Sequence, residues 1–182
     1  MIQISIFSVQ LLITFLWVLL RCLACIRKGY ISWKREAQLF LVYVALQVVI
    51  RFTFFPFSKI DGQIQPLPFD PVQAFPFRIN LLPFVYLFDY PTSREALINL
   101  IGNTAMFVPI GILWPAIFRE LNTHTRAITV GIGFSLCIEL LQLPFHTRVS
   151  DIDDLILNSL GYLLGYAIYW LYRWIRRKRA AR

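Results

Sequence analysis

The sequence predicts an all-α fold, a polytopic bundle of about five transmembrane helices with its N-terminus outside and its C-terminus in the cytoplasm. Composition is the first indication, because 58% of the 182 residues are hydrophobic and only 15% are charged. A soluble protein of that composition would expose many apolar side chains to water. The second indication is that the apolar residues form five runs, each close to the ~20 residues that a helix needs to cross hydrocarbon.

The first two spans are predicted at residues 2–20 and 39–57. The first carries no charged side chain. It should remain in the mature protein, because it lacks the basic start and small-residue cleavage site of a secretory signal. The second is interrupted by Gln47 and Arg51 and closed by Pro56. Polar groups are costly in lipid, so this polar face is expected to look into the bundle or to extend toward the interface.

The segment 58–95 has a different composition, rich in proline and aromatic residues and poor in strong helix formers. It predicts a long outer loop, and loops of this length are usually functional or disordered. The aromatic side chains favour packing against the bundle or at the membrane interface. A re-entrant or interfacial stretch is expected near residues 77–88.

The remaining spans are predicted at residues 96–118, 127–143 and 155–175, and Pro144 ends the fourth span. The turn between the third and fourth spans is short. The sequence contains no repeat and no low-complexity tract, so residues 1–182 are predicted to form a single membrane domain.

The positions of lysine and arginine predict the orientation, because short loops rich in these residues stay in the cytoplasm. With five spans, the first loop, the third loop and the C-terminal tail fall on one side and carry most of the positive charge. The basic residues there are Arg27, Lys28, Lys34, Arg35, Arg119, Arg126, Arg173, Arg176, Arg177, Lys178, Arg179 and Arg182. The basic residues that give the net charge of +8 are therefore distributed as in a membrane anchor. Nucleic-acid binding is not expected, because no basic stripe covers a folded surface.

Polar side chains recur at helical spacing within the last three spans, where each would be costly without a partner. Asn99 and Asn103 are four residues apart in the third span, about one helical turn. Glu139 and Gln142 are three residues apart in the fourth span, slightly less than one turn. In the fifth span, a polar and glycine stripe about 60° wide runs along one face. Its members are Asp154, Asn158, Gly161 and Gly165, with Asp151 close to the stripe and Asp153 outside it.

These polar residues are expected to lie at the same level in the membrane, because in the predicted topology all three polar stripes are near the outer ends of their helices. The expected result is a polar pocket in the outer leaflet. Arg148, in the connection between the fourth and fifth spans, is the nearest cation for the acidic groups. The segment 80–84 is expected to help cover the pocket.

Helix packing is the alternative explanation for each of these residues. The two glycines of the fifth span favour packing, because small residues let helices approach closely in a membrane. For the amide side chains of the third and fourth spans, packing and function are equally favoured. Glu139 and Asp154 favour function, because an ionisable group within a span usually marks a site, although a structural pair with Arg148 would also satisfy them.

The motifs, taken in order, are Asn80-Leu-Leu-Pro-Phe84, Asn99-x-x-x-Asn103-x-x-x-Phe107-x-Pro109-x-Gly111, Glu139-x-x-Gln142, Arg148 and Asp151-x-x-Asp154-x-x-x-Asn158-x-x-Gly161-x-x-x-Gly165. This ordered set resembles the VanZ-like family over residues 40–175. The resemblance implies a multi-pass protein of the bacterial plasma membrane, in a family named for low-level resistance to the glycopeptide teicoplanin, and it supplies no defined reaction. On this resemblance, the binding positions are Asn80, Asn99, Asn103, Glu139, Gln142, Arg148, Asp151, Asp154 and Asn158.

Three functions stay open. In the first, the pocket binds a membrane lipid, a lipid-linked cell-wall precursor or the glycopeptide, without chemistry. In the second, the protein is an enzyme acting on a lipid head group, with Glu139 and Asp154 as general acid and base or as ligands of a divalent cation. No other cofactor is expected, and the oxygen-rich donor set suits Mg²⁺ or Ca²⁺. The third is transport or assembly with a partner protein, and transport by five helices would need an oligomer.

Overall fold

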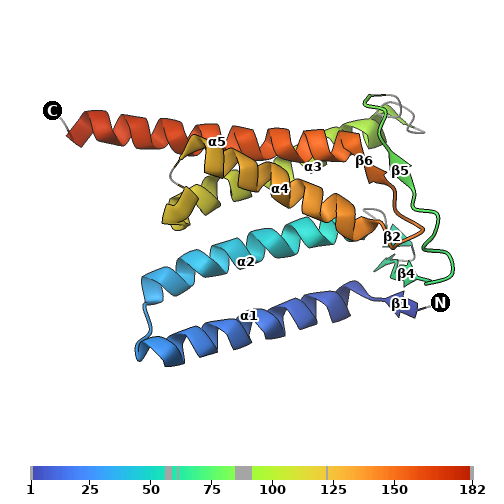
Figure 1. The fold of residues 1–182 in the computed structure, drawn as a ribbon, viewed down its shortest axis with the longest axis horizontal. Helices are drawn as coiled ribbons and strands as arrows, with labels where there is room; N and C mark the ends of the chain where they lie inside the picture. Colours follow the sequence, from blue (N-terminus) through green and yellow to red (C-terminus); the bar gives the residue numbers. More distant parts are fainter. Residues whose placement is uncertain (1, 56–58, 61, 85–91, 122, 181–182) are drawn as a thin grey trace. The chain divides into compact units, whose positions relative to one another are not determined.

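Five long helices dominate the computed structural model, which describes residues 2–55, 59–60, 62–84, 92–121 and 123–180 (Figure 1). The helices are α1 (Ile6–Lys28), α2 (Trp33–Phe54), α3 (Ser93–Ile117), α4 (His124–Gln142) and α5 (Ile152–Ala180). All five are long and apolar enough to cross a membrane by length and composition. The predicted all-α fold with about five spans is therefore confirmed, while the orientation of the termini stays a prediction.

Local hydrogen bonds set the ends of the helices. Ser5 precedes α1, and its side chain accepts a hydrogen bond from the backbone N–H of Ser8. At the other end, Gly29 has a φ of 72° and its N–H donates to the last carbonyls of α1, so the chain can turn at once into α2. Thr92 and Thr123 cap α3 and α4 in the same way as Ser5 caps α1.

Short strands replace two stretches that the sequence predicts differently. The first span was expected from residue 2, but β1 (Ile2–Ile4) pairs antiparallel with β4 (Leu67–Phe69), and helix α1 begins only at Ile6. The predicted outer loop contains β4 together with β2 (Lys59–Ile60), β3 (Gln63–Ile64) and β5 (Ile79–Asn80). Part of the re-entrant stretch expected near residues 77–88 falls outside the described residues.

The chain divides into two compact units. The first comprises Met1–Phe77 with Pro144–Arg148, and the second comprises Arg78–Leu143 with Val149–Arg182. The first unit holds the α1–α2 hairpin and strands β1 to β4, and the second holds α3, α4, α5 and the strand pair β5–β6, where β6 is Ser150–Asp151. A single membrane domain over residues 1–182 stays a prediction.

Glycines bring α3 and α5 together within the second unit. A Cβ added at Gly161 would lie 2.0 Å from the carbonyl oxygen of Thr104, and one at Gly165 would lie 2.1 Å from that of Val108. Both distances are far below any real contact, so only glycine permits this approach. The predicted packing role of these two glycines is confirmed, and it matches the way that small residues join membrane helices.

Polar contacts join α1 and α2 within the first unit. Arg21 and Glu36 form an ion pair in which the guanidinium Nε lies 2.7 Å from the carboxylate Oε2. Further along, the Gln47 amide donates to the backbone carbonyl of Gln10 across the hairpin at 3.3 Å. The inward-facing alternative for Gln47 is therefore the one observed.

Candidate functional site

Several of the predicted polar residues gather in the second unit, where the end of α4, strand β6 and the start of α5 follow closely in the chain. Helix α4 ends at Gln142, β6 is Ser150–Asp151, and α5 begins at Ile152. Strand β5 runs parallel to β6, with Asn80 opposite Asp151. Figure 1 shows β5 and β6 beside the first turns of α5. Side chains from distant parts of the sequence therefore meet at one end of this unit.

Glu139 lies at the centre of this group, and its side chain is only 3% exposed. Its Oε2 atom accepts a hydrogen bond of 2.9 Å from the backbone N–H of Asp151. Its Oε1 atom is buried and has no hydrogen-bond partner among the described residues. Asp154 and Asp151 lie close enough for their charges to act on Glu139. Oε2 thus holds the backbone, while Oε1 has no partner among the described residues, although the Ser150 side chain lies near the carboxylate.

Asp151 connects the strand pair to the start of α5. Its Oδ1 atom accepts hydrogen bonds from the Asn80 side-chain amide at 3.0 Å and from the backbone N–H of Asp153 at 2.9 Å. The Asn80 side-chain oxygen Oδ1 accepts a hydrogen bond of 3.1 Å from the backbone N–H of Leu82. These hydrogen bonds attach the residues after β5 to the acidic cluster. The expectation that segment 80–84 covers a pocket stays a prediction.

Asp154 joins α5 to α3. Its Oδ1 atom accepts a hydrogen bond from the side-chain amide of Asn103. The same amide lies 3.5 Å from the Asn99 side-chain oxygen, at the limit of a hydrogen bond. Asn103 therefore connects α3 to the start of α5, and Asn99 reaches this group through Asn103. Their depth in the membrane stays a prediction.

Asn158 and Gln142 are also buried. Asn158 is 1% exposed, and its side-chain oxygen Oδ1 has no hydrogen-bond partner within the part of the chain that the structure describes. Gln142 is 4% exposed at the end of α4. Asn158 follows Asp154 by one helical turn, so both lie on the same side of α5.

Arg148 belongs to the first unit, unlike the carboxylates. Its Nε and Nη2 atoms donate to the backbone carbonyl of Phe54, the last residue of α2, at 3.0 Å and 2.5 Å. Arg148 thus helps to satisfy a helix end, where carbonyl groups otherwise lack partners. Its expected role opposite the acidic groups stays a prediction.

Asp153 is a site residue that the sequence pattern missed. It is 5% exposed, and its Oδ1 atom accepts a hydrogen bond of 2.9 Å from the backbone N–H of Phe84. At ~100° per residue, Asp153 lies off the face of α5 that carries Asp154 and Asn158, so the polar stripe does not include it. An acidic residue in the first turn of a helix that follows a loop was the available signal, since such carboxylates often accept backbone N–H bonds there.

The arrangement is rich in hydrogen-bond acceptors. The buried oxygens of Glu139 and Asn158 both require donors, which a hydroxyl, amide or ammonium group would supply. Among the described residues, no group of three or more His, Cys, Asp or Glu side chains is placed to hold a metal ion. These buried acceptors suit a ligand with several hydrogen-bond donors. The general acid and base roles expected for Glu139 and Asp154 stay a prediction.

Comparison with known proteins places the chain in a family. The family model of VanZ/LLP1 proteins matches residues 40–173. Protein VanZ of Enterococcus faecium is 31% identical over 93 residues, which cover 51% of this chain and 53% of that protein. The chain thus matches about half the length of this curated relative. No solved structure gives a significant match. Because the family model covers well over half of the chain, and because the matched region contains every motif residue of the site, this protein belongs to the VanZ/LLP1 family.

Proposed function

We propose that the acidic cluster of the second unit binds the polar head of a lipid-linked cell-wall component in the outer leaflet of the bacterial plasma membrane. The observation that carries this proposal is the pair of buried acceptors, Glu139 Oε1 and Asn158 Oδ1, which lack partners among the described residues. Leaving such atoms unsatisfied costs about 1–3 kcal/mol each. A bound head group with hydroxyl or amide donors would remove that cost.

The segment after β5 supports this function because it is attached to the cluster by specific contacts. Asn80 bonds to Asp151, and the backbone N–H of Phe84 bonds to Asp153. The exposed Leu81, Leu82 and Phe84 provide apolar surface beside the polar groups. A ligand with a polar head and an apolar chain meets both kinds of surface.

Resistance to teicoplanin-type glycopeptides would follow if occupation of this site reduced access of the antibiotic to its precursor. The similarity to Protein VanZ and the family membership support this direction. Expression of the wild-type chain in a susceptible bacterium is expected to raise the teicoplanin concentration needed to stop growth. Glu139→Gln, expressed to the same level, is expected to lose that effect. Equal protection by the wild type and by Glu139→Gln would show that the Glu139 carboxylate is not needed for resistance.

The direct test is lipid-resolved native mass spectrometry of purified protein, with divalent metal analysis on the same samples. The wild-type protein is expected to retain a lipid-linked component that Glu139→Gln loses. Glu120→Gln is the matched control, because Glu120 is exposed in the short 3₁₀ turn Arg119–Leu121. If no ligand is retained by the wild type and Glu139→Gln is merely less stable, the cluster serves helix packing instead.

The second candidate function is an enzyme that acts on a lipid head group. The interaction between the charges of Glu139 and Asp154 favours it, because paired carboxylates can divide the roles of general acid and base. Under this alternative, Glu139→Gln and Asp154→Asn keep the ligand but abolish turnover of lipid-linked substrate. A binding protein would show reduced affinity without any turnover in the wild type.

A further inference from the structure

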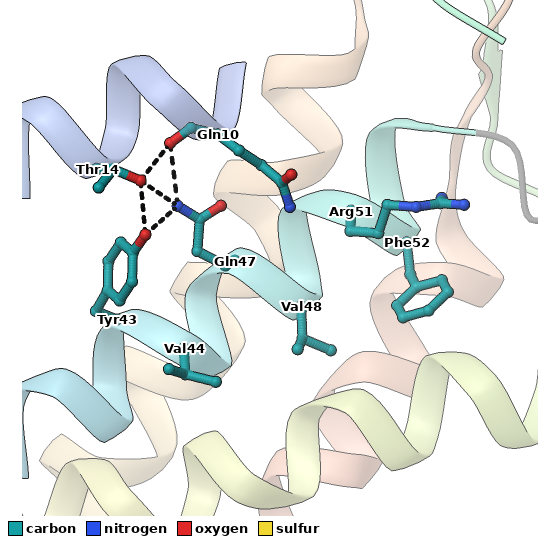
Figure 2. A pocket seen from close by; sticks show the side chains of 8 residues that line it. All are labelled: Gln10, Thr14, Tyr43, Val44, Gln47, Val48, Arg51 and Phe52. Atoms are coloured by element: carbon teal, nitrogen blue, oxygen red, sulfur yellow. Dashed lines mark hydrogen bonds between the residues drawn. The ribbon is translucent and has the colours of Figure 1, made fainter. Parts of the chain in front are cut away.

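A second polar site lies in the first unit, between α1 and α2, where the function proposed above has no residue. A cavity of about 440 Å³ opens there, lined by Gln10, Thr14, Tyr43, Val44, Gln47, Val48, Arg51 and Phe52. Figure 2 shows Thr14, Tyr43 and Gln47 meeting at the backbone carbonyl of Gln10, with Val44, Val48 and Phe52 along α2. The cavity therefore has a polar wall and an apolar wall.

A hydrogen-bond network fixes the polar wall. The hydroxyl oxygens of Thr14 and Tyr43 lie 2.6 Å apart, and the Thr14 hydroxyl donates to the Gln10 carbonyl at 2.6 Å. The Gln47 amide nitrogen donates to the same carbonyl at 3.3 Å and to the Tyr43 hydroxyl at 3.1 Å. Because a backbone carbonyl only accepts, this contact fixes the Gln47 nitrogen on the network side.

The fixed amide leaves Gln47 Oε1 as an acceptor that is buried and has no hydrogen-bond partner among the described residues. A ligand at this position must therefore donate a hydrogen bond. In hydrocarbon, a hydrogen-bond acceptor without a donor is costly. Packing of α1 against α2 would not by itself require an unpaired acceptor between the helices. The network accordingly suits a hydroxyl or amide donor entering from the cavity.

Arg51 places a positive charge one helical turn beyond Gln47 on the same face of α2. At ~1.5 Å per residue, Arg51 lies ~5 Å from the end of α2 at Phe54 and Gln47 lies ~10 Å from it. Figure 2 shows the Arg51 side chain directed away from the Gln47 network. A ligand aligned with α2 would thus meet a cation near the membrane surface and a hydrogen-bond acceptor one turn deeper.

We propose that the cavity between α1 and α2 binds an anionic lysophospholipid. Its phosphate lies at Arg51, its free glycerol hydroxyl donates to Gln47 Oε1, and its single acyl chain lies along Val44, Val48 and Phe52. In a diacyl phospholipid both glycerol oxygens at this depth are esters, which accept hydrogen bonds and cannot donate them. Head-group hydroxyls lie on the water side of the phosphate and do not reach Gln47.

Titration of lipids into the full-length protein in phosphatidylcholine nanodiscs, read by native mass spectrometry, tests this inference. Lysophosphatidylglycerol is expected to bind about tenfold more tightly than phosphatidylglycerol, because only the former donates to Gln47. It is also expected to bind more tightly than lysophosphatidylcholine, which has no net negative charge. Equal binding of the lyso and diacyl forms would overturn the role of the hydroxyl.

Matched variants assign the binding to this cavity. Gln47→Leu is expected to remove the preference for the lyso form, and Arg51→Gln the preference for the anion. Gln38→Leu is the control, because Gln38 is on the same helix and does not line the cavity. If Gln47→Leu fails to fold, the Arg51→Gln variant and the wild-type affinities for the lyso and diacyl lipids still test the inference. Unchanged binding in Arg51→Gln would reject the site.

Glu139→Gln in the same titration separates this inference from the function proposed for the second unit. Loss of the preference for the lyso form in Gln47→Leu but not in Glu139→Gln assigns the lipid to the α1–α2 cavity. The reverse pattern would overturn the inference and assign the lipid to the acidic cluster. No measurable preference for any lipid, with Gln47→Leu less stable, would show that the network only joins the two helices.

Discussion

The carboxylates of the second unit accept hydrogen bonds from backbone N–H groups as well as from side chains. Glu139 accepts from Asp151, Asp151 from Asp153, and Asp153 from Phe84. Bonds to charged acceptors are among the stronger ones, at about 1.5–3 kcal/mol. These contacts hold the segment after β5 in place, including Phe84 at its unusual φ of 64°. Part of the acidic cluster is therefore structural, while Glu139 Oε1 and Asn158 Oδ1 are buried acceptors without a partner among the described residues.

Asp153→Ala is predicted to loosen the segment after β5, because the Phe84 N–H would lose its acceptor. The expected loss of stability is about 1–3 kcal/mol, measured by thermal unfolding in detergent. Faster proteolysis within residues 78–84 should accompany it. Asp153→Asn keeps an acceptor oxygen and is expected to restore most of the protection. Equal melting of Asp153→Ala and the wild type would mean that this bond does not hold the segment.

The sequence predicts the five long helices well, because their apolar length follows from the thickness of a membrane. It does not predict β1, because Ile2–Ile4 pairs with Leu67–Phe69 more than sixty residues away and hydropathy carries no information about such partners. Asp153 was missed for a related reason. Its partner is the backbone of Phe84, and a backbone N–H has no signature in the sequence.

Gly161→Ala is predicted to destabilise the contact between α3 and α5, because the new Cβ would overlap the Thr104 carbonyl. Overpacking of this kind costs about 1–3 kcal/mol, so the melting temperature in detergent should fall. Gly102→Ala is the matched control on α3, since a Cβ there meets nothing within 4 Å. It should be neutral or stabilising by up to about 1 kcal/mol, because alanine favours the helix. Equal effects of the two substitutions would contradict the close approach.

Helix α5 is longer than a membrane crossing requires. Its 29 residues extend ~44 Å at ~1.5 Å per residue, against a hydrocarbon core of ~30 Å. The excess carries Arg177, Lys178 and Arg179 in the last turns. Lys178 lies 3.9 Å from the centre of the Trp174 ring, an arrangement that suits the interface between lipid and water. This end of α5 is expected on the cytoplasmic side.

The orientation decides which leaflet the acidic cluster faces, so it can be tested apart from any ligand. In a variant with Cys22, Cys25 and Cys137 replaced by serine, single cysteines are introduced and labelled in intact cells with a maleimide that does not cross membranes. Cysteines at Gln3 and Gln73 are expected to react at once. Cysteines at Ser32 and Glu120 should react only after permeabilisation, because the neighbouring loops carry the positive charge. Five spans require these two pairs to behave oppositely. The inverted pattern would turn the acidic cluster toward the cytoplasm, and its proposed ligand would then have to be a lipid-linked precursor before export.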